Sequence, residues 1–356
     1  MKPGKQFLAL WREGSSVKMI DQRKLPHLYE VATFESHRET AKAIKDMVTR
    51  GAGCVGNAAA FAMAQAALEA RDKPPTEFQA YLKEASETIK ATRPTAVNLF
   101  KAVDRCLAAV DGVSVAERVE RVVAEADKVF LEDIEASRAI AKYGAALIEE
   151  GARVLTHCNA GALAYVDRGT ALAPIYQAFE DGLSVFVWVD ETRPRNQGAR
   201  LTSWELGQQG VPHTVIADNA AGFFMQRGEV DLILVGADRI TSNGDVVNKI
   251  GTYEKALAAH DNGIPFWVAA PLMSFDFETP AGTGVEIEER PTEEVSHVWG
   301  MGEGGWTRVR VVSQGATVRN PAFDVTPARL VSGFITEYGL VKPPFRENLK
   351  KLSRLG

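Results

Sequence analysis

The chain has 356 residues, of which 46% are hydrophobic and 24% are charged, and its formal net charge is −5. This length accommodates two domains of ordinary size, and the composition is typical of a globular protein with little disorder. The acidic balance argues against nucleic acid as the main partner, because binding a phosphate backbone requires clustered lysines and arginines.

The cysteines also limit the possible functions. Cys54, Cys106 and Cys158 lie far apart, without the CxxC spacing of a zinc or redox site, which fits a reducing, cytoplasmic compartment. The N-terminal MKPGKQFLALWREG holds only a brief apolar run, and no uncharged apolar stretch reaches membrane-spanning length. We therefore expect no signal peptide and no membrane partner. The six histidines show no HExxH pattern, so we expect no metal site.

The chain shows two successive patterns of residue spacing, the first helical and the second alternating between strand and helix. Residues 36 to 150 are mostly Ala-, Glu- and Lys-rich with helical spacing, which predicts a mainly helical domain over residues 1–125 and a connector helix over 126–150. From residue 151 to 356, short β-rich runs alternate with helical stretches: RVLTHC, LSVFVWVDE, HTVIAD, DLILVGAD and PFWVAA. This alternation predicts βαβ units, a parallel sheet and an α/β fold. The closing ENLKKLSRLG is interpreted as a solvated basic tail.

Chemistry is expected at the carboxyl ends of these strands, where parallel sheets form their ligand crevice. Cys158, Glu191, Asp218 and Asp238 occupy such ends. Asp238 follows the apolar run DLILV, and a carboxylate in a partly dry crevice has a raised pKa and can act as a general acid or base. The alternative is an aspartate that caps a turn or pairs with Arg239. Asn248 and Lys249 follow, just before the next helix.

The stretch TRGAGCVGNAAAFAMA runs from Arg50 through a Gly-Ala-Gly turn into an Ala-rich helix. Glycines let backbone amides approach an anion closely. The partial positive charge of a helix N-terminus and the forked donors of an arginine both favour the binding of phosphate. A phosphate cradle and a simple tight turn before a packed helix are equally compatible with this stretch. In TRPTAVNLF, Arg93 is either a second phosphate clamp or a surface ion-pair partner.

THCNAGALA places Cys158 at a strand exit, with AGALA opening the next helix. The helix N-terminus can lower the pKa of such a thiol, and nearby amides can hold an oxyanion or a phosphate. Inert packing is the alternative for an isolated cysteine, although the polar turn favours function. In ETRPRNQGARLTSWEL, three arginines surround Asn196, Gln197 and Gly198, which favours a substrate-facing loop over a surface charge run.

Taken together, RGAG, TRPTAVNL, THCNAGALA, TRPRNQGARLTSWEL, GADRITSNGDVVNKIGTY and VRNPAFDVTP resemble the methylthioribose-1-phosphate isomerase family, in order and over nearly the whole chain. The resemblance implies a small N-terminal domain, a Rossmann-like C-terminal domain, a homodimer, a small sugar phosphate as the molecule bound, and no cofactor. Regulatory subunits of a translation-initiation exchange factor share this fold and are binding proteins.

The resemblance also assigns roles to individual residues. Cys158 and Asp238 match the catalytic pair. The substrate-binding positions are matched by Arg50, Gly51, Ala52, Arg93, Gln197, Asn248 and Lys249. The expected reaction converts 5-methylthioribose 1-phosphate to the ribulose 1-phosphate in methionine salvage, with Asp238 protonating the ring oxygen and Cys158 acting as base or stabilising the transition state.

One departure leaves the 5-substituent open. Where the family usually continues Arg-Gly-Ala with Pro-Ala-Ile-Gly, this chain has Gly53, Cys54, Val55 and Gly56, followed by Asn57. Asn57 either points into the pocket and selects a polar or small 5-substituent, or caps the Ala-rich helix. Isomerisation of 5-deoxyribose 1-phosphate or ribose 1,5-bisphosphate, and a non-catalytic regulatory or nucleotide-sensing role, are the alternatives.

Overall fold

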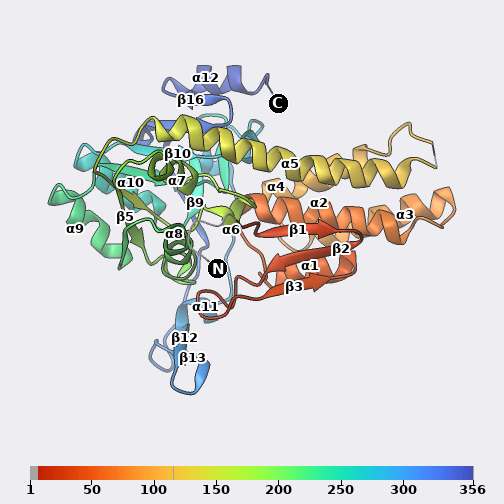
Figure 1. The fold of residues 1–356 in the computed structure, drawn as a ribbon, viewed down its shortest axis with the longest axis horizontal. Helices are drawn as coiled ribbons and strands as arrows, with labels where there is room; N and C mark the ends of the chain where they lie inside the picture. The colour runs from red at the N-terminus through yellow and green to blue at the C-terminus, as the bar shows by residue number, and fades with distance from the viewer. Residues whose placement is uncertain (1–6, 115, 356) are drawn as a thin grey trace.

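The computed structural model describes residues 7–114 and 116–355, so the first six residues of the N-terminal segment discussed above lie outside it. Two halves lie side by side and are joined by a long helix, α5 (Arg118–Ala145), which runs across both (Figure 1). This helix begins before residue 126, where the connector was predicted to begin. It packs against α2 (Ala52–Glu69) of the first half and α7 (Leu172–Glu180) of the second.

The first half combines helices with a small sheet that the sequence did not suggest. Strands β1 (Leu10–Glu13), β2 (Ser16–Ile20) and β3 (Val31–Phe34) form an antiparallel sheet. The remaining helices of this half are α1 (His37–Lys45), α3 (Pro75–Lys90) and α4 (Val97–Ala108). Helix α2 is apolar on all sides, and it is accordingly surrounded by α1, α3, α4 and α5.

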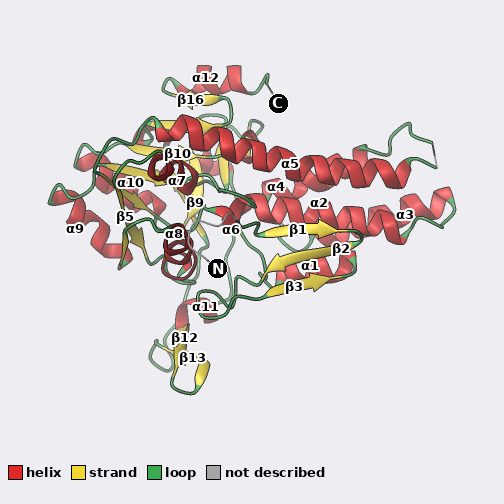
Figure 2. Cartoon of the chain, viewed as in Figure 1, coloured by secondary structure: helices red, strands yellow, loops and turns green. Residues whose placement is uncertain are grey.

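The second half is built on a seven-stranded sheet of order β16-β15-β10-β7-β4-β5-β6, which is parallel except at its β16 edge. The strands are β4 (Ala152–Thr156), β5 (Val185–Asp190), β6 (His213–Ile216), β7 (Leu232–Val235), β10 (Phe266–Ala269), β15 (Gly333–Thr336) and β16 (Gly339–Val341). All five predicted β-rich runs contain one of these strands, so the predicted α/β fold is confirmed (Figure 2).

Both faces of this sheet are buried, which explains the continuous apolar runs of its strands. Leu155, Ile233 and Val235 belong to one core, while Val154 and Leu234 belong to the core on the opposite face. The helices of this half as far as residue 261 are α6 (Ala162–Tyr165), α7, α8 (Ser203–Gln209), α9 (Ala221–Gln226) and α10 (Thr252–Asp261). A π-helical turn, Gly198–Thr202, precedes α8.

A second sheet, of order β11-β8-β9-β14, lies beside the carboxyl ends of the first and was not predicted. Its strands are β8 (Arg239–Thr241), β9 (Val246–Lys249), β11 (Phe275–Asp276) and β14 (Phe323–Thr326). A hairpin of β12 (His297–Gly302) and β13 (Gly305–Arg310) follows α11 (Glu293–Ser296) and projects from the body (Figure 1).

The closing segment is a helix, α12 (Phe345–Leu352), and not a solvated tail. Phe345, Leu349 and Leu352 recur at helical spacing and are buried, while the basic residues between them face solvent. None of the helices in the described part of the chain combines the length and apolarity needed to span a bilayer.

Candidate active site

Asp238 lies where the chain leaves β7 of the seven-stranded sheet and enters β8 of the smaller sheet. Its backbone N–H donates to the Val247 carbonyl at 3.0 Å, which anchors it to β9. The half-buried side chain lines a cavity of about 40 Å³ with Gly51, Ala52 and Arg93. The structure therefore brings together residues from three predicted motifs.

Gly51 lets the first turn of α2 approach this cavity. Its φ is 91°, and a Cβ placed on it would lie 2.5 Å from the Cα of Ala164. Glycine is therefore required both by the backbone conformation and by the close contact with α6. No side chain caps this end of α2, so its first backbone amides and the partial positive charge of the helix end remain for an anion.

Arg50 and Gln197 border a second, smaller space of about 10 Å³ beside the first. The Arg50 guanidinium donates to Asn159 twice, from Nη1 to Oδ1 at 2.6 Å and from Nη2 to the carbonyl at 2.9 Å. This orients the remaining donors of Arg50. Gln197 is 5% exposed and its Oε1 has no hydrogen-bond partner among the described residues. A buried polar atom of this kind is rare without a ligand or water to pair with it.

Cys158 is held in a left-handed conformation, with φ of 66°. Its backbone N–H donates to Thr192 Oγ1 at 2.8 Å, and its carbonyl accepts from Thr202 Oγ1 at 2.6 Å. Both threonines belong to the ETRPRNQGARLTSWEL motif, so that loop fixes the direction of the thiol. Cys158 is 8% exposed, and a non-glycine residue in this conformation is a mark of a functional constraint.

Two of the backbone amides after Cys158, those of Ala162 and Leu163, are not free to hold an oxyanion. Helix α6 is a single turn, and Glu205 accepts from the N–H groups of Ala162 at 2.8 Å and Leu163 at 3.2 Å. Burial raises the pKa of Glu205, while these donors and Asn159 lower it. A buried carboxylate from α8 therefore binds the two backbone amides at the start of α6.

Lys249 and Asn248 lie on β9, and not directly at the start of a helix. Lys249 donates from Nζ to the Ala322 carbonyl at 2.7 Å. Burial lowers the pKa of Lys249 to about 7, and the charge of Arg290 acts in the same direction, whereas Cys158 and Asp238 act in the opposite one. This lysine is therefore within electrostatic reach of both proposed catalytic residues. Asn248 is buried and donates to Thr252 Oγ1 at 3.0 Å.

Arg93 belongs to a partly buried charge cluster that sequence reasoning missed. Its Nη2 lies 3.5 Å from Glu288 Oε2, and Arg290 donates from Nε to Glu288 Oε1 at 3.1 Å. Burial opposes the ionisation of Glu288, but Arg290 and Arg93 lower its pKa. The Nε of Arg93 is inaccessible to solvent and has no partner among the described residues. In sequence, EIEERP has the composition of a surface charge run, which hid Glu288 and Arg290.

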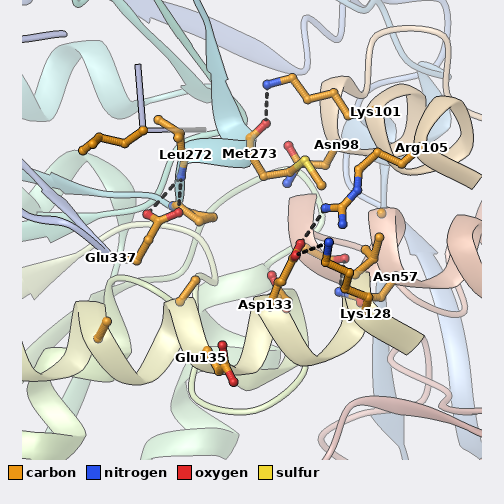
Figure 3. A pocket seen from close by; sticks show the side chains of 18 of the residues that line it. Asn57, Asn98, Lys101, Arg105, Lys128, Asp133, Glu135, Leu272, Met273 and Glu337 are labelled. Carbon is orange, nitrogen blue, oxygen red and sulfur yellow. Dashed lines mark hydrogen bonds and ion pairs between the residues drawn. The ribbon is translucent and has the colours of Figure 1, made fainter. Parts of the chain in front are cut away.

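Asn57 faces a different cavity, of about 890 Å³, on the other side of α2 (Figure 3). This cavity is lined by Asn57, Asn98 and Asp133 among others, and by neither Cys158 nor Asp238. Asn57 donates from Nδ2 to the Gly53 carbonyl at 2.9 Å, one turn back in the helix. The helix-capping interpretation of Asn57 is therefore wrong, because the N-cap of α2 is Gly51, and Asn57 does not line the cavity of Asp238.

The other two residues of the departure serve packing. A Cβ on Gly53 would lie 2.3 Å from Cδ1 of Tyr165, so this position accommodates the tyrosine ring. Cys54 is fully buried, and its sulfur accepts from the backbone N–H of Val166 at 3.4 Å. Burial raises its pKa to about 12, which leaves the thiol protonated and unreactive.

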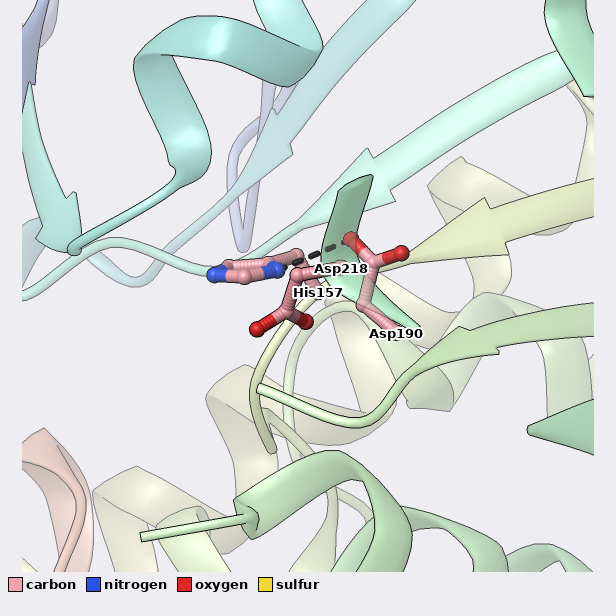
Figure 4. Close-up of side chains that lie close together, drawn as sticks. All are labelled: His157, Asp190 and Asp218. Atoms are coloured by element: carbon pink, nitrogen blue, oxygen red, sulfur yellow. Dashed lines mark hydrogen bonds and ion pairs between the residues drawn. The ribbon is translucent and has the colours of Figure 1, made fainter. Parts of the chain in front are cut away.

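His157, Asp190 and Asp218 bring potential metal-ligand atoms within 4.8 Å of one another (Figure 4). Most of their polar atoms are already engaged, although Asp190 Oδ1 has no hydrogen-bond partner among the described residues. The His157 Nδ1 lies 2.9 Å from Asp190 Oδ2, its Nε2 lies 2.9 Å from the Ile250 carbonyl, and Asp218 accepts from the backbone N–H groups of Thr192 and Arg193 at 2.7 Å each. The arrangement is that of a hydrogen-bonded cluster that shapes the loop after β5.

Comparison with known proteins identifies the family. Residues 48–343 match the Initiation factor 2 subunit family. A methylthioribose-1-phosphate isomerase from Methylocella silvestris is 50% identical, over 95% of this chain and 94% of its own. The chain belongs to the methylthioribose-1-phosphate isomerase family.

Solved structures support this membership. The crystal structure of 5-methylthioribose 1-phosphate isomerase from Pyrococcus horikoshii OT3 has a TM-score of 0.87 and 44% identity, covering 99% of this chain and 97% of that one. A structure described as translation initiation factor eIF-2B, subunit delta, from A. fulgidus has a TM-score of 0.82 and 43% identity, covering 98% and 99%. The family therefore includes members with an enzymatic and members with a translational description.

Proposed function

We propose that this protein is an aldose–ketose isomerase that converts 5-methylthioribose 1-phosphate to the corresponding ribulose 1-phosphate, in methionine salvage. The observation that carries the proposal is full-length identity of 50% to a relative named for this reaction. The cavity that joins Asp238 to Gly51, Ala52 and Arg93 supports it, because a carboxylate beside an anion-binding helix end suits a sugar phosphate.

The chemistry assigns Asp238 and Cys158 complementary roles. Phosphate on the anomeric oxygen prevents ordinary opening to a free aldehyde, so Asp238 donates a proton to the ring oxygen as its bond to C1 breaks. Hydrogen then moves from C2 to C1. The 2-hydroxyl loses its proton as the carbonyl forms, and this proton replaces the one that Asp238 gave to the ring oxygen. Cys158 acts as the base at C2 or stabilises the transition state, so the reaction is either proton transfer through a phosphoenolate or direct hydride transfer.

The phosphate is bound by the first turn of α2 together with cations from both halves of the molecule. Arg50 contributes a guanidinium oriented by Asn159, and Arg93 contributes one whose Nε lacks a partner within the part of the chain that the structure describes. Gln197 offers an unpaired Oε1 to a sugar hydroxyl. Lys249 and Asn248 face the substrate from the smaller sheet. We infer that the protein works in the cytoplasm as a homodimer and needs no cofactor.

The test is conversion of four forms of ribose 1-phosphate by the purified protein, carrying a 5-methylthio, 5-deoxy, 5-hydroxy or 5-phospho group, with ketose detected by NMR. We expect the highest kcat/KM with the 5-methylthio form. A higher value with the 5-deoxy or 5-phospho form would reassign the substrate within the same reaction type. Absence of ketose from all four would contradict the isomerase.

A second candidate is a non-catalytic regulatory or nucleotide-sensing subunit, favoured by the 43% identity to the structure named as an eIF-2B delta subunit. The four-substrate experiment separates the two candidates, because a regulatory protein would bind a ligand without forming ketose. Calorimetric binding of a sugar phosphate or nucleotide, in the absence of turnover, is the result expected of this alternative.

A further inference from the structure

The imidazole of His157 bridges the two sheets directly behind the candidate active site. His157 follows β4 of the seven-stranded sheet and immediately precedes Cys158, whereas its Nε2 contacts the carbonyl of Ile250, which immediately follows Lys249 at the end of β9. Its Nδ1 contacts Asp190 at the end of β5 (Figure 4). One side chain therefore contacts the ends of three strands, from two different sheets.

Both ring nitrogens face oxygen acceptors, which fixes the proton arrangement. A carbonyl oxygen can only accept, so Nε2 carries a proton and donates it to Ile250 at 2.9 Å. A second proton lies between Nδ1 and Asp190 Oδ2, also 2.9 Å apart. The side chains of His157 and Asp190 are fully inaccessible to solvent, and Lys255 Nζ lies 3.7 Å from the same carboxylate. Asp218 and Asp324 are the other charged groups near the ring.

The surroundings leave little freedom for this ring. Gly251, whose φ is 100°, lies against it, and a Cβ placed there would be 3.0 Å from the His157 Cε1. The backbone N–H of Gly251 donates to Asp324 Oδ2 at 2.7 Å, which fixes the turn that carries the Ile250 carbonyl. The position of the ring thus determines the separation between the backbone of Cys158 and that of Lys249.

We propose that His157 is a positioning residue for the isomerase reaction, whose Nε2–Ile250 hydrogen bond holds Cys158 and Lys249 at the separation that the substrate requires. Among the described residues of the cluster, the hydrogen bond from His157 Nε2 is the one that directly joins the segment before Cys158 to the segment after Lys249. The inference rests on the proposed function, because it concerns the geometry of that same site.

The first test compares His157→Ala with His37→Ala, using steady-state kinetics on 5-methylthioribose 1-phosphate. His37 is a matched control, since it is also buried and pairs through Nδ1 with Glu69 Oε2 at 2.5 Å, but it lies in α1. We expect His157→Ala to lower kcat on the order of 10- to 100-fold with little change in KM, and His37→Ala to keep kcat per folded molecule. Near-normal kcat in folded His157→Ala would overturn the proposal.

The second test keeps the proposal testable if His157→Ala does not fold. A glutamine amide reaches the place of Nε2 and can still donate to Ile250, whereas an asparagine amide reaches only the place of Nδ1, next to Asp190. We expect His157→Gln to retain several-fold more kcat than His157→Asn, at similar melting temperatures. Equal kcat in the two variants, or a higher value for asparagine, is inconsistent with the Nε2 contact as the positioning element.

A third measurement separates this proposal from the function on which it rests. Cys158 is 8% exposed, while Cys54 and Cys106 are fully buried, so iodoacetamide should alkylate Cys158 first without any substrate present. We expect alkylation of Cys158 to be several-fold faster in His157→Ala or His157→Asn than in the natural protein, and unchanged in His37→Ala. An unchanged rate in the His157 variants would overturn the positioning role, whereas absence of ketose formation by the natural protein would overturn only the proposed function.

Discussion

Two cavities of very different volume lie on opposite sides of the N-terminal turns of α2, and the proposed catalytic carboxylate lines the smaller one. On one side, a cavity of about 40 Å³ joins Asp238, Arg93, Gly51 and Ala52 from three segments. On the other, about 890 Å³ is lined by charged side chains of which some are paired, such as Arg105 with Glu125 and Glu132, whereas Asp133 Oδ2 has no hydrogen-bond partner among the described residues. Unpaired donors, an uncapped helix end and a strand-end carboxylate therefore locate the candidate chemistry better than the size of a cavity does.

The largest expected effect is at the proposed catalytic pair, of which Asp238 lines the small cavity and Cys158 lines neither cavity. Replacing Cys158 by alanine removes the group proposed to act at C2, and we expect kcat to fall by about 10²- to 10⁴-fold while the fold survives. Steady-state turnover and circular dichroism measure the two properties. Cys106→Ala is the control, because Cys106 is fully buried in the first half of the molecule and should leave kcat unchanged. Near-normal kcat in Cys158→Ala would remove the thiol from the mechanism.

Arg50→Ala tests phosphate binding. The guanidinium acts on a phosphate that is already charged in the ground state, so its loss should raise KM by roughly 10- to 100-fold and change kcat less. Arg38→Ala, which removes an exposed pair with Glu84, should alter neither constant. A fall in kcat with normal KM would argue instead that Arg50 acts in the transition state.

A smaller effect concerns pH. Burial and the charge of Arg290 lower the pKa of Lys249 to about 7, so the lysine is a cation below this pH and becomes neutral above it. If its charge assists phosphate binding, kcat/KM should fall above pH 7 by up to about tenfold for each pH unit. The fall should end at the value of kcat/KM for the enzyme with a neutral lysine. In Lys249→Met, kcat/KM should be low and this limb of the profile absent. Persistence of the limb in that variant would assign it to a different group.

The smallest effect is expected on the side of the roomy cavity. Asn57→Ala removes a hydrogen bond within α2 and should lower the free energy of unfolding by about 1 kcal/mol. The order of kcat/KM for the 5-methylthio, 5-deoxy, 5-hydroxy and 5-phospho substrates should stay as in the natural protein. A changed order would show that Asn57 does influence the choice of the 5-substituent.

The parts of the fold that were predicted correctly are those with strong local signals. Runs such as DLILV are continuous and apolar because the parallel sheet is buried on both faces, and this pattern is readable from sequence. The short strands β1 to β3 and β8 to β9 were missed, because three to five residues with mixed burial carry little periodicity. The helix α12 was hidden by its basic residues, although its apolar positions follow helical spacing.

In the candidate site, too, features with a local sequence signal were predicted and features that depend on distant contacts were not. The position of Asp238 could be predicted, because it follows an apolar strand and ligand sites form at the carboxyl ends of parallel strands. The turn at Gly51 lines the same cavity but lies at the start of a helix in the other half, and only the family resemblance placed it at the site. The bond from Glu205 to the amides of Ala162 and Leu163 could not be foreseen, since these segments are far apart in sequence. The role of His157 was equally hidden, because the Ile250 carbonyl that it contacts carries no sequence signal.

One measurement tests most directly whether the chemistry belongs to the small cavity. Asp238 and Asp133 are both half-buried aspartates beside the first turns of α2, one lining each cavity. Burial raises the pKa of Asp133 well above its usual range, so asparagine is a close neutral substitute there. The kcat of Asp238→Asn and Asp133→Asn on 5-methylthioribose 1-phosphate should differ by at least about 100-fold, with Asp133→Asn close to the natural protein. Near-normal turnover in Asp238→Asn, or a comparable loss in folded Asp133→Asn, would contradict the account.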